Sequence, residues 1–334
     1  MPEKQRIAVV GAGAIGCVVG GLLHRAGEDV TLIGKKEQAE AINRYGLRIK
    51  RAEDELNIDV KAATELDFSP HIVLLAVKSQ DVKDACLAIK GPAKDSVTVA
   101  MQNGLRGDEE AADVLGEENV MGCVVFFSAS YLEPGTVNYT KEGSLIVGSP
   151  YGHHEKARQA GDLLSRIMKT VVTENIKGAR YTKLLLNVMG NSIDAMTGKA
   201  LAECSADTAV RRIAALVIKE SLEVIERSGG RPASLPGMPV SVLKPAIKLP
   251  LPVTAFLLKP LLKDETQESS TLQSIKRGRP VETGYLNGEI VRMAEENNME
   301  APVNSRVMEI IGEVSQSKNF VSTSELAGRF KEFF

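Results

Sequence analysis

The sequence predicts an α/β domain built on a parallel sheet, followed by a domain made only of helices. Short apolar runs rich in β-branched residues alternate with helical patterns in the first half, which is typical of an open sheet covered on both faces. These runs are 6–10, 29–33, 71–77 and 96–101. Beyond about residue 178 the patterns become purely helical. A chain of 334 residues is long enough for two domains of ordinary size.

The remaining elements follow in chain order. In the first half we expect a helix that runs to about residue 26, helices at 80–89 and 108–115, a strand–turn–strand at 124–140 that turns at Pro134-Gly135, a strand at 144–148, a helix at 153–168 and a strand at 170–173. In the second half we expect long helices near 179–197, 207–228, 283–298 and 303–317. The boundary is therefore placed near residue 175, giving domains 1–175 and 176–334.

Composition and charge exclude several classes of protein. A net charge of -2 gives no reason to expect a nucleic acid or a membrane as partner. The four cysteines lie far apart, which argues against zinc and disulfides and favours a reducing compartment. His153-His154 has no further ligands nearby, so no metal is expected. With no apolar signal region and no run of membrane-span length, we expect a cytoplasmic protein.

A glycine motif follows the first strand directly and opens the first helix. Its sequence is Gly11-Ala12-Gly13-Ala14-Ile15-Gly16, which matches G-x-G-x-x-G. Gly11 would permit the tight turn, Gly13 the approach of a pyrophosphate, and Gly16 close packing of helix on strand. The unpaired N–H groups at the start of the helix, which includes Ala14 and Ile15, would favour the phosphates. We therefore predict a Rossmann-type dinucleotide-binding domain.

The end of the second strand bears on the choice of cofactor. An NAD site usually has an acid there to hold the ribose 2′-hydroxyl, but this strand runs into Gly34-Lys35-Lys36, and no acid appears before Glu37. Lysines at this place favour the 2′-phosphate of NADP(H), with Lys35 as its partner. The alternative is that both lysines are ordinary surface residues.

Two polar residues follow later strands at the edge of the sheet where ligands bind. Lys78 comes after 71–77, and Asn103 comes after 96–101. Lys78 can bond ribose, phosphate or substrate oxygens, and Asn103 offers a donor and an acceptor near the nicotinamide. Taken singly, each would more often be an ordinary loop residue.

The helix at 180–197 carries a polar line among apolar residues. Lys183, Asn187 and Asn191 are spaced four apart and span only about 80° of arc, so they share one face. Asparagine is a poor helix former, and a solvent-exposed stripe would normally use longer charged residues, so a cleft is favoured over an exposed stripe. Lys183 would be suited to stabilise and protonate an alkoxide formed by hydride addition to a ketone.

Residues 229–264 hold seven of the fourteen prolines, together with many Leu, Val and Ile residues. A solvated linker would be more polar. We interpret the segment as a packed, irregular stretch with short helices or as an oligomer interface, which allows a homodimer. An active-site lid is the less favoured alternative.

Over nearly its whole length the chain resembles the ketopantoate reductase family. The resemblance rests on GAGAIG, the lysine of AVKSQD, the asparagine of QNG, the K-x-x-x-N-x-x-x-N helix and SSTLQSIKRGRPVETGYLNG. It implies a Rossmann domain followed by a helical domain, with the active site between them. It also implies reduction of 2-dehydropantoate by NADPH to D-pantoate, on the route to pantothenate and coenzyme A.

The resemblance also implies roles for single residues. Lys183 would be the general acid, and Glu282 would be a catalytic partner carboxylate that bonds the substrate hydroxyl. The family's binding residues for cofactor or substrate match Lys35, Lys78, Asn103, Asn187, Asn191 and Ser270. From the sequence itself, Glu282 would begin a helix, where an acid suits the helix dipole. Gly284 and Gly288 on that helix would indicate close packing.

The chain departs from the family pattern in its second half. Ser192 stands where the family usually has proline, and Thr283-Gly284 stand where it commonly has Ile-Asp. A further substrate-binding asparagine has no match near Leu201, and the segment 229–264 is longer than expected. These departures lie in or near the substrate domain, so they bear on the substrate and not on the cofactor or Lys183. Reduction of another branched 2-oxo acid, as in a 2-hydroxy-acid or opine-type dehydrogenase, stays open, as does a cofactor-binding regulator without catalysis.

Overall fold

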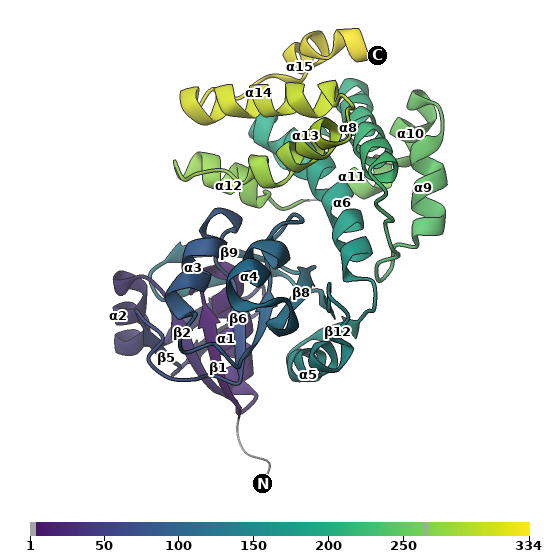
Figure 1. Ribbon diagram of the computed structural model, residues 1–334. Coiled ribbons are helices and arrows are strands. Elements are labelled where there is room, and N and C mark those ends of the chain that lie inside the picture. The colour runs from purple at the N-terminus through teal and green to yellow at the C-terminus, as the bar shows by residue number, and fades with distance from the viewer. Residues whose placement is uncertain (1–4, 264–265) are drawn as a thin grey trace. The chain divides into compact units, whose positions relative to one another are not determined.

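The structure, a computed structural model, describes residues 5–263 and 266–334. The chain divides into two compact units, Met1–Ile176 and Lys177–Phe334 (Figure 1). The strands, all in the first unit, are β1 (Arg6–Val10), β2 (Asp29–Ile33), β3 (Leu47–Lys50), β4 (Glu55–Ile58), β5 (Lys61–Ala63), β6 (Ile72–Leu75), β7 (Val97–Ala100), β8 (Val120–Val125), β9 (Ser128–Glu133), β10 (Thr136–Lys141), β11 (Ser144–Gly148) and β12 (Lys169–Val172). Its helices are α1 (Ala14–Arg25), α2 (Lys36–Tyr45), α3 (Val82–Ile89), α4 (Gly107–Leu115) and α5 (His154–Ser165), with short 3-10 helices η1 (Ser79–Asp81) and η2 (Glu117–Asn119).

The main sheet has eight strands in the order β12-β11-β8-β7-β6-β1-β2-β5. All neighbours are parallel except β8 and β11. The predicted α/β fold class is confirmed. From β1 the chain builds the sheet outward through β2 on one side and later through β6 on the other. The strand order therefore reverses at β1, and in open α/β sheets ligands bind outside the carboxyl ends of the strands at such a point.

A second, four-stranded sheet of order β4-β3-β10-β9 was not predicted. The run from residue 124 to 133, expected as a single strand, is split between the two sheets. It breaks at Phe126, whose N–H donates to the carbonyl of Ser144 (2.9 Å). The turn at Pro134-Gly135 is confirmed, with Gly135 at φ 78°. Strands β3 to β5 are three or four residues long, too short for a period-two pattern to stand out.

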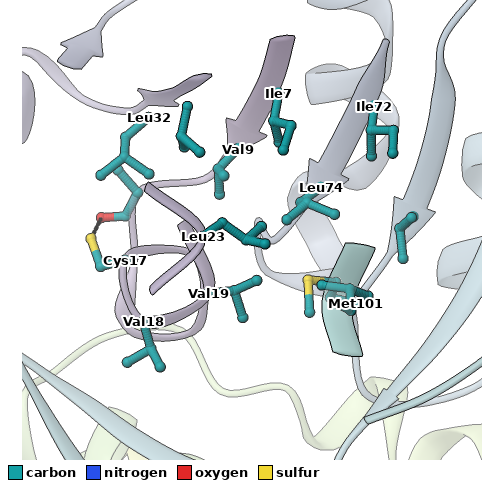
Figure 2. Close-up of a cluster of buried hydrophobic side chains, with 14 of the residues drawn as sticks. Ile7, Val9, Cys17, Val18, Val19, Leu23, Leu32, Ile72, Leu74 and Met101 are labelled. Carbon is teal, nitrogen blue, oxygen red and sulfur yellow. Dashed lines mark hydrogen bonds between the residues drawn. The ribbon is translucent and has the colours of Figure 1, made fainter. Parts of the chain in front are cut away.

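The core of the first unit forms where α1 covers the central strands. Val9, Leu32 and Leu74 come from three neighbouring strands, and Val19 and Leu23 of α1 lie against them (Figure 2). All five side chains are fully buried. Burying such side chains contributes about 1.5–3 kcal/mol each. This packing fixes the start of α1, and hence the glycine motif, against the end of β1.

The second unit is helical in the part that the structure describes. Its helices are α6 (Ile176–Thr197), α7 (Leu201–Cys204), α8 (Thr208–Arg227), α9 (Val240–Lys248), α10 (Leu251–Leu257), α11 (Lys259–Lys263), α12 (Ser270–Lys276), α13 (Asn287–Glu296), α14 (Pro302–Ser317) and α15 (Thr323–Arg329), with 3-10 helices η3 (Thr283–Tyr285) and η4 (Lys331–Phe333). Helix α8 is central, because it contacts α9, α10, α13, α14 and α15. None of the described helices is long and apolar enough to cross a membrane.

Residue 264 of the proline-rich segment lies outside the described residues, and residues 229–263 contain the short helices α9, α10 and α11. Leu243, Ile247 and Leu262 are buried, which confirms the expectation of a packed stretch. Its other side exposes apolar side chains, most strongly Phe256 (71% exposed) and Val242 (64%). Pro239 and Pro250 directly precede α9 and α10, although Pro245 lies inside α9, and the apolar residues between the prolines anchor the segment.

The prediction that a helix begins at Glu282 is wrong. A three-residue 3-10 turn, η3, comes first, the backbone breaks at Leu286, and α13 begins only at Asn287. Glu282 precedes η3 and makes no side-chain cap there. The prediction of close packing at Gly284 is also wrong, since a Cβ added there would meet open space. At Gly288 it would meet the flexible end of Met308 at 3.2 Å and the backbone carbonyl of Thr283 at 3.5 Å.

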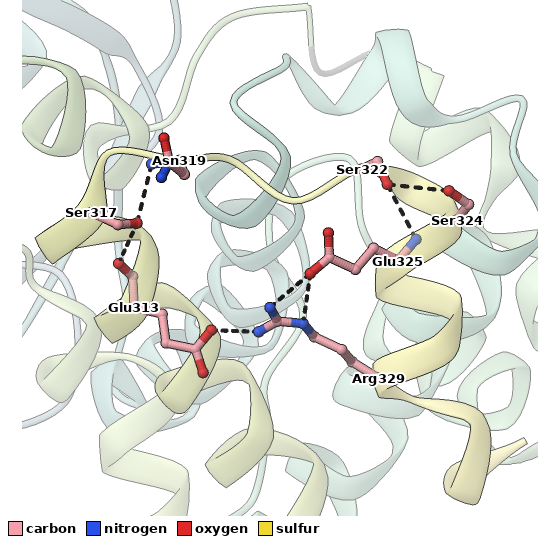
Figure 3. A network of polar contacts seen from close by, with 7 residues as sticks. All are labelled: Glu313, Ser317, Asn319, Ser322, Ser324, Glu325 and Arg329. Atoms are coloured by element: carbon pink, nitrogen blue, oxygen red, sulfur yellow. Dashed lines mark hydrogen bonds and ion pairs between the residues drawn. The ribbon is translucent and has the colours of Figure 1, made fainter.

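Polar contacts hold the C-terminal helix α15 against α14. The guanidinium of Arg329 bonds both Glu313 of α14 and Glu325 of α15 (Figure 3). Ser322 caps α15 by accepting the N–H of Glu325 at 3.2 Å. These contacts are exposed, so they fix geometry more than they add stability.

Candidate active site

The glycine motif forms a tight turn between β1 and α1. Gly11 has φ +107°, and a Cβ there would lie 2.5 Å from the backbone nitrogen of Val77. A Cβ on Gly16 would lie 2.1 Å from the carbonyl oxygen of Gly11. Both positions therefore exclude any larger residue, as expected for a tight turn and for close packing of helix on strand. At Gly13, in contrast, a Cβ would meet nothing within 4 Å, so the loop is open on that side.

The start of α1 suits an anion. No side chain caps this helix at Gly13, and its first turn contains no acidic residue. Ala14, Ile15 and Gly16 form that first turn, where the backbone N–H groups lack partners within the helix. The N-terminus of a helix attracts negative charge through these groups and through the helix dipole.

Lys35 lies at the N-cap of α2, directly beyond the end of β2, and is exposed. The neighbouring Lys36 pairs with Glu40 at 3.8 Å. Within the described ranges, 5–263 and 266–334, no ion pair involves Lys35. Of the two lysines, Lys35 is therefore the one whose charge is not already balanced within α2.

Gln38, which was not predicted as a site residue, supports the glycine loop from α2. Its side-chain amide donates to the carbonyl of Ala12 (2.9 Å), and its oxygen accepts the N–H of Gly135 (2.9 Å). Gln38 is 4% exposed. A glutamine in the first turn of a surface helix carries no pattern that distinguishes it, and only the tertiary structure reveals this role.

The loops that carry Lys78 and Asn103 lie side by side. Lys78 precedes η1, just after β6, and Ser79 beside it bonds the carbonyl of Asn103 at 3.3 Å. Gln102, a second missed residue, donates to the carbonyls of Leu75 and Val77 at 2.8 and 3.0 Å and ties the two loops together. Because β7, β6, β1 and β2 are neighbours in the sheet, the loops bearing Asn103, Lys78, the glycine motif and Lys35 share one edge.

In the second unit, Lys183, Asn187 and Asn191 form one polar line along α6. The helix is continuous over all three residues, so the predicted shared face is confirmed. Asn187 is 8% exposed, and Lys183 and Asn191 are partly buried. The line is therefore not a solvent-exposed stripe. Three polar side chains in line on one partly buried helix face can contact a polar ligand together.

Asp194 extends this line and was also missed. It lies eleven residues after Lys183, about 20° from it around the helix and within the same arc. Its carboxylate accepts the N–H of Ser269 at 2.7 Å and the hydroxyl of Ser269 at 2.8 Å. Burial raises the pKa of Asp194 to about 7, although the bonds from Ser269 oppose this shift. The same helical spacing that revealed Lys183 and the asparagines could have revealed Asp194.

Ser269 and Ser270 begin α12. Ser269 is the N-cap, and its hydroxyl accepts the N–H of Leu272 at 3.2 Å. Ser270 is the first residue of the helix and is exposed. The two bonds that Ser269 donates to Asp194 therefore tie the end of the polar line on α6 to the residue immediately before Ser270.

Known proteins resemble this chain over most of its length. The family model described as "Ketopantoate reductase PanE/ApbA" matches residues 7–152, and the model of its C-terminal part matches residues 175–315. The 2-dehydropantoate 2-reductase of Pyrococcus horikoshii is 32% identical over 303 residues, which cover 90% of this chain and 94% of that protein. This chain belongs to the ketopantoate reductase family.

Other members and solved structures resemble the chain over similar lengths. The 2-dehydropantoate 2-reductase of Pyrococcus abyssi is 30% identical over 90% of this chain and 94% of its own length. A ketopantoate reductase structure from Ralstonia eutropha is 26% identical, covers 94% of this chain and 99% of its own, and has a TM-score of 0.78. A D-mandelate dehydrogenase bound to NADH and anilino(oxo)acetate, 22% identical with a TM-score of 0.80, covers 93% of this chain and 99% of its own and shares the fold.

In this ketopantoate reductase family member, a buried polar network starts at Ser192, where the family usually has proline. The Ser192 hydroxyl lies 3.1 Å from the side-chain oxygen of Asn287, and the Asn287 amide donates to Asn304 at 2.9 Å. The Asn304 amide donates in turn to Glu220 of α8 at 2.7 Å. Since Asn287 begins α13, the network ties the segment after Glu282 to α6.

Proposed function

We propose that this protein reduces 2-dehydropantoate to D-pantoate with NADPH, on the route to pantothenate and coenzyme A. The observation that carries the proposal is the partly buried polar line Lys183–Asn187–Asn191 on α6, in a chain of the ketopantoate reductase family. The names of its relatives from two Pyrococcus species support the substrate.

The first unit has the features that a dinucleotide requires. The open side of Gly13 and the uncapped first turn of α1 fit a pyrophosphate. In this proposal the N–H groups of Ala14, Ile15 and Gly16 face the phosphates. Lys78 and Asn103, on the neighbouring loops of the same edge, would hold the ribose and the nicotinamide.

The preference for NADPH over NADH depends on Lys35. It occupies the end of β2, where an acid would hold the ribose 2′-hydroxyl of NADH. A lysine without an ion-pair partner among the described residues is suited to attract a 2′-phosphate. The preference is thus an electrostatic one at a single exposed position.

Lys183 is the proposed catalytic acid. When bound, NADPH supplies the hydride that adds to the ketone carbon of the substrate. The ketone oxygen then gains negative charge, which the Lys183 ammonium stabilises before it donates a proton to give the hydroxyl. Lysine regains its proton from water. In this proposal Asn187, Asn191, Ser270 and Glu282 bond the carboxylate and hydroxyl oxygens of the substrate.

A homodimer is a further part of the proposal. Helices α9 and α10 expose Val242, Val253, Phe256 and Leu257, all between 43% and 71%. Exposed apolar side chains grouped on neighbouring helices favour association. This surface lies in the proline-rich segment that the sequence analysis singled out.

The deciding experiment measures loss of NADPH absorbance with ketopantoate beside a panel of other 2-oxo acids, with and without amines. Turnover well above the rest with ketopantoate is expected. Turnover only with another 2-oxo acid would contradict the substrate but keep the mechanism. A need for an amine would indicate an opine-type enzyme, and cofactor binding without turnover of any acid would indicate a regulator.

A further inference from the structure

The carboxylate of Asp194 has no part in the proposed chemistry, yet it is 2% exposed on the helix face that carries Lys183. Burying a carboxylate costs free energy unless strong hydrogen bonds compensate. Each of its oxygens accepts a bond from Ser269: Oδ2 accepts the Ser269 N–H and Oδ1 accepts the Ser269 hydroxyl. An apolar residue could be buried here at a lower free-energy cost. The carboxylate therefore has a role that an apolar residue could not fill, which is to hold Ser269 in place.

The two bonds determine how α12 begins. Because the Ser269 hydroxyl donates to Asp194, its lone pairs are oriented to accept the N–H of Leu272, which caps the helix. With its N–H and hydroxyl both held, Ser269 has little rotational freedom. The next residue, Ser270, is the exposed serine assigned to the substrate.

We infer that Asp194 is a positioning residue that fixes Ser270 against the substrate-binding face of α6. The inference rests on the proposed function. Asp194 and Asn191 lie three residues apart, on one face of the same helix, so the clamp ties Ser270 to the helix that carries the other substrate contacts. Without Asp194 the start of α12 can shift relative to α6, and the substrate loses a preformed contact.

The test compares steady-state kinetics of Asp194→Asn and the wild type with ketopantoate. Asparagine keeps the size of aspartate but turns a donor toward the donor groups of Ser269. At about pH 8, where Asp194 is ionised, we expect the KM for ketopantoate to rise about tenfold or more, the scale of a lost charge-assisted hydrogen bond. The KM for NADPH should stay within about twofold, because the change lies in the second unit.

A double-mutant cycle with Ser270→Ala separates positioning from general damage. If Asp194 acts through Ser270, the change Asp194→Asn should have little further effect on the KM once Ser270 is alanine. Equal factors in both backgrounds would overturn the inference, and so would an unchanged KM in Asp194→Asn.

Two further variants keep the result interpretable. Ser269→Ala removes the hydroxyl from the other side of the same contact, and a KM increase is expected even if Asp194→Asn folds poorly; no increase would overturn the inference. Ser322→Ala removes the cap of α15, a helix of the same seven-residue length, and should leave the KM unchanged. If the wild type itself reduces no 2-oxo acid, the proposed function fails first and this inference fails with it. Wild-type turnover with an unaffected Asp194→Asn removes only the inference.

Discussion

At the scale of single residues, Lys183 is the group on which the proposed chemistry depends. Lys183→Ala removes the proton donor and the positive charge, so we expect kcat to fall by at least about a hundredfold. The KM for NADPH should change little. Lys177→Ala, near the start of the same helix but outside the polar line, is the matched control. A near-normal kcat in the Lys183 variant would remove the mechanism.

Lys35 tests the preference for the cofactor. Lys35→Asp places a negative charge where the 2′-phosphate of NADPH would lie and offers an acceptor to the ribose hydroxyl of NADH. We expect the KM for NADPH to rise by about tenfold or more, with a much smaller change for NADH. Lys36→Asp is the control, because it changes the charge of the protein by the same amount at the neighbouring residue. Equal effects on both cofactors would show that Lys35 acts only as a surface charge.

At the scale of elements, the sequence was informative wherever a pattern repeated along one element. The central strands and α6 were predicted because apolar runs and helical spacing are properties of a single segment. In the small sheet, the pair β9 and β10 follows the predicted strand–turn–strand, but β3 and β4 were missed because each has only four residues and β3 pairs with β10, far away in sequence. Gln38 and Gln102 were missed for the same reason, since their partners come from other loops.

The error at Glu282 has a different cause. The segment 283–296 has a helical pattern, but the backbone breaks at Leu286, where φ is -118° and ψ is -92°. The break allows Asn287 to start α13 and to join the buried network with Ser192. Such a network is a tertiary requirement that overrides local propensity.

Helices α9 and α10 carry the prediction about assembly. Phe256→Ser removes the most exposed apolar side chain of these helices without touching the buried residues that anchor them. If they form a dimer interface, light scattering should show a dimer for the wild type and a monomer for the variant. Tyr45→Ser, on α2 of the other unit, removes another exposed side chain (62%) and should keep the dimer. A monomeric wild type, or a variant that stays dimeric, would contradict the interface.

At the scale of the whole molecule, the dependence of stability on pH should report the buried Asp194. Burial raises its pKa from 3.8 to about 7 in the folded protein. Between these values the folded state holds a proton that the unfolded state has lost. The free energy of unfolding therefore decreases as pH rises through this window, by up to about 1.4 kcal/mol per pH unit. Above the folded pKa this contribution is constant.

Other carboxylates oppose this slope, so the effect must be measured as a difference. The pKa of Asp207 is lowered despite partial burial, because it accepts hydrogen bonds from Thr323 and from the backbone of α8. The pKa of Glu226 is lowered in the same way by Lys244 and Lys248. The stabilising contribution of these two carboxylates decreases as pH falls. Because the wild type and Asp194→Asn both contain them, this contribution cancels when the two proteins are compared. Urea unfolding at about pH 5 and about pH 8 should show the variant gaining about 2–3 kcal/mol relative to the wild type at the higher pH. Parallel stability profiles would mean that Asp194 is ionised in the folded protein throughout this range, and that its bonds to Ser269 outweigh the cost of burial.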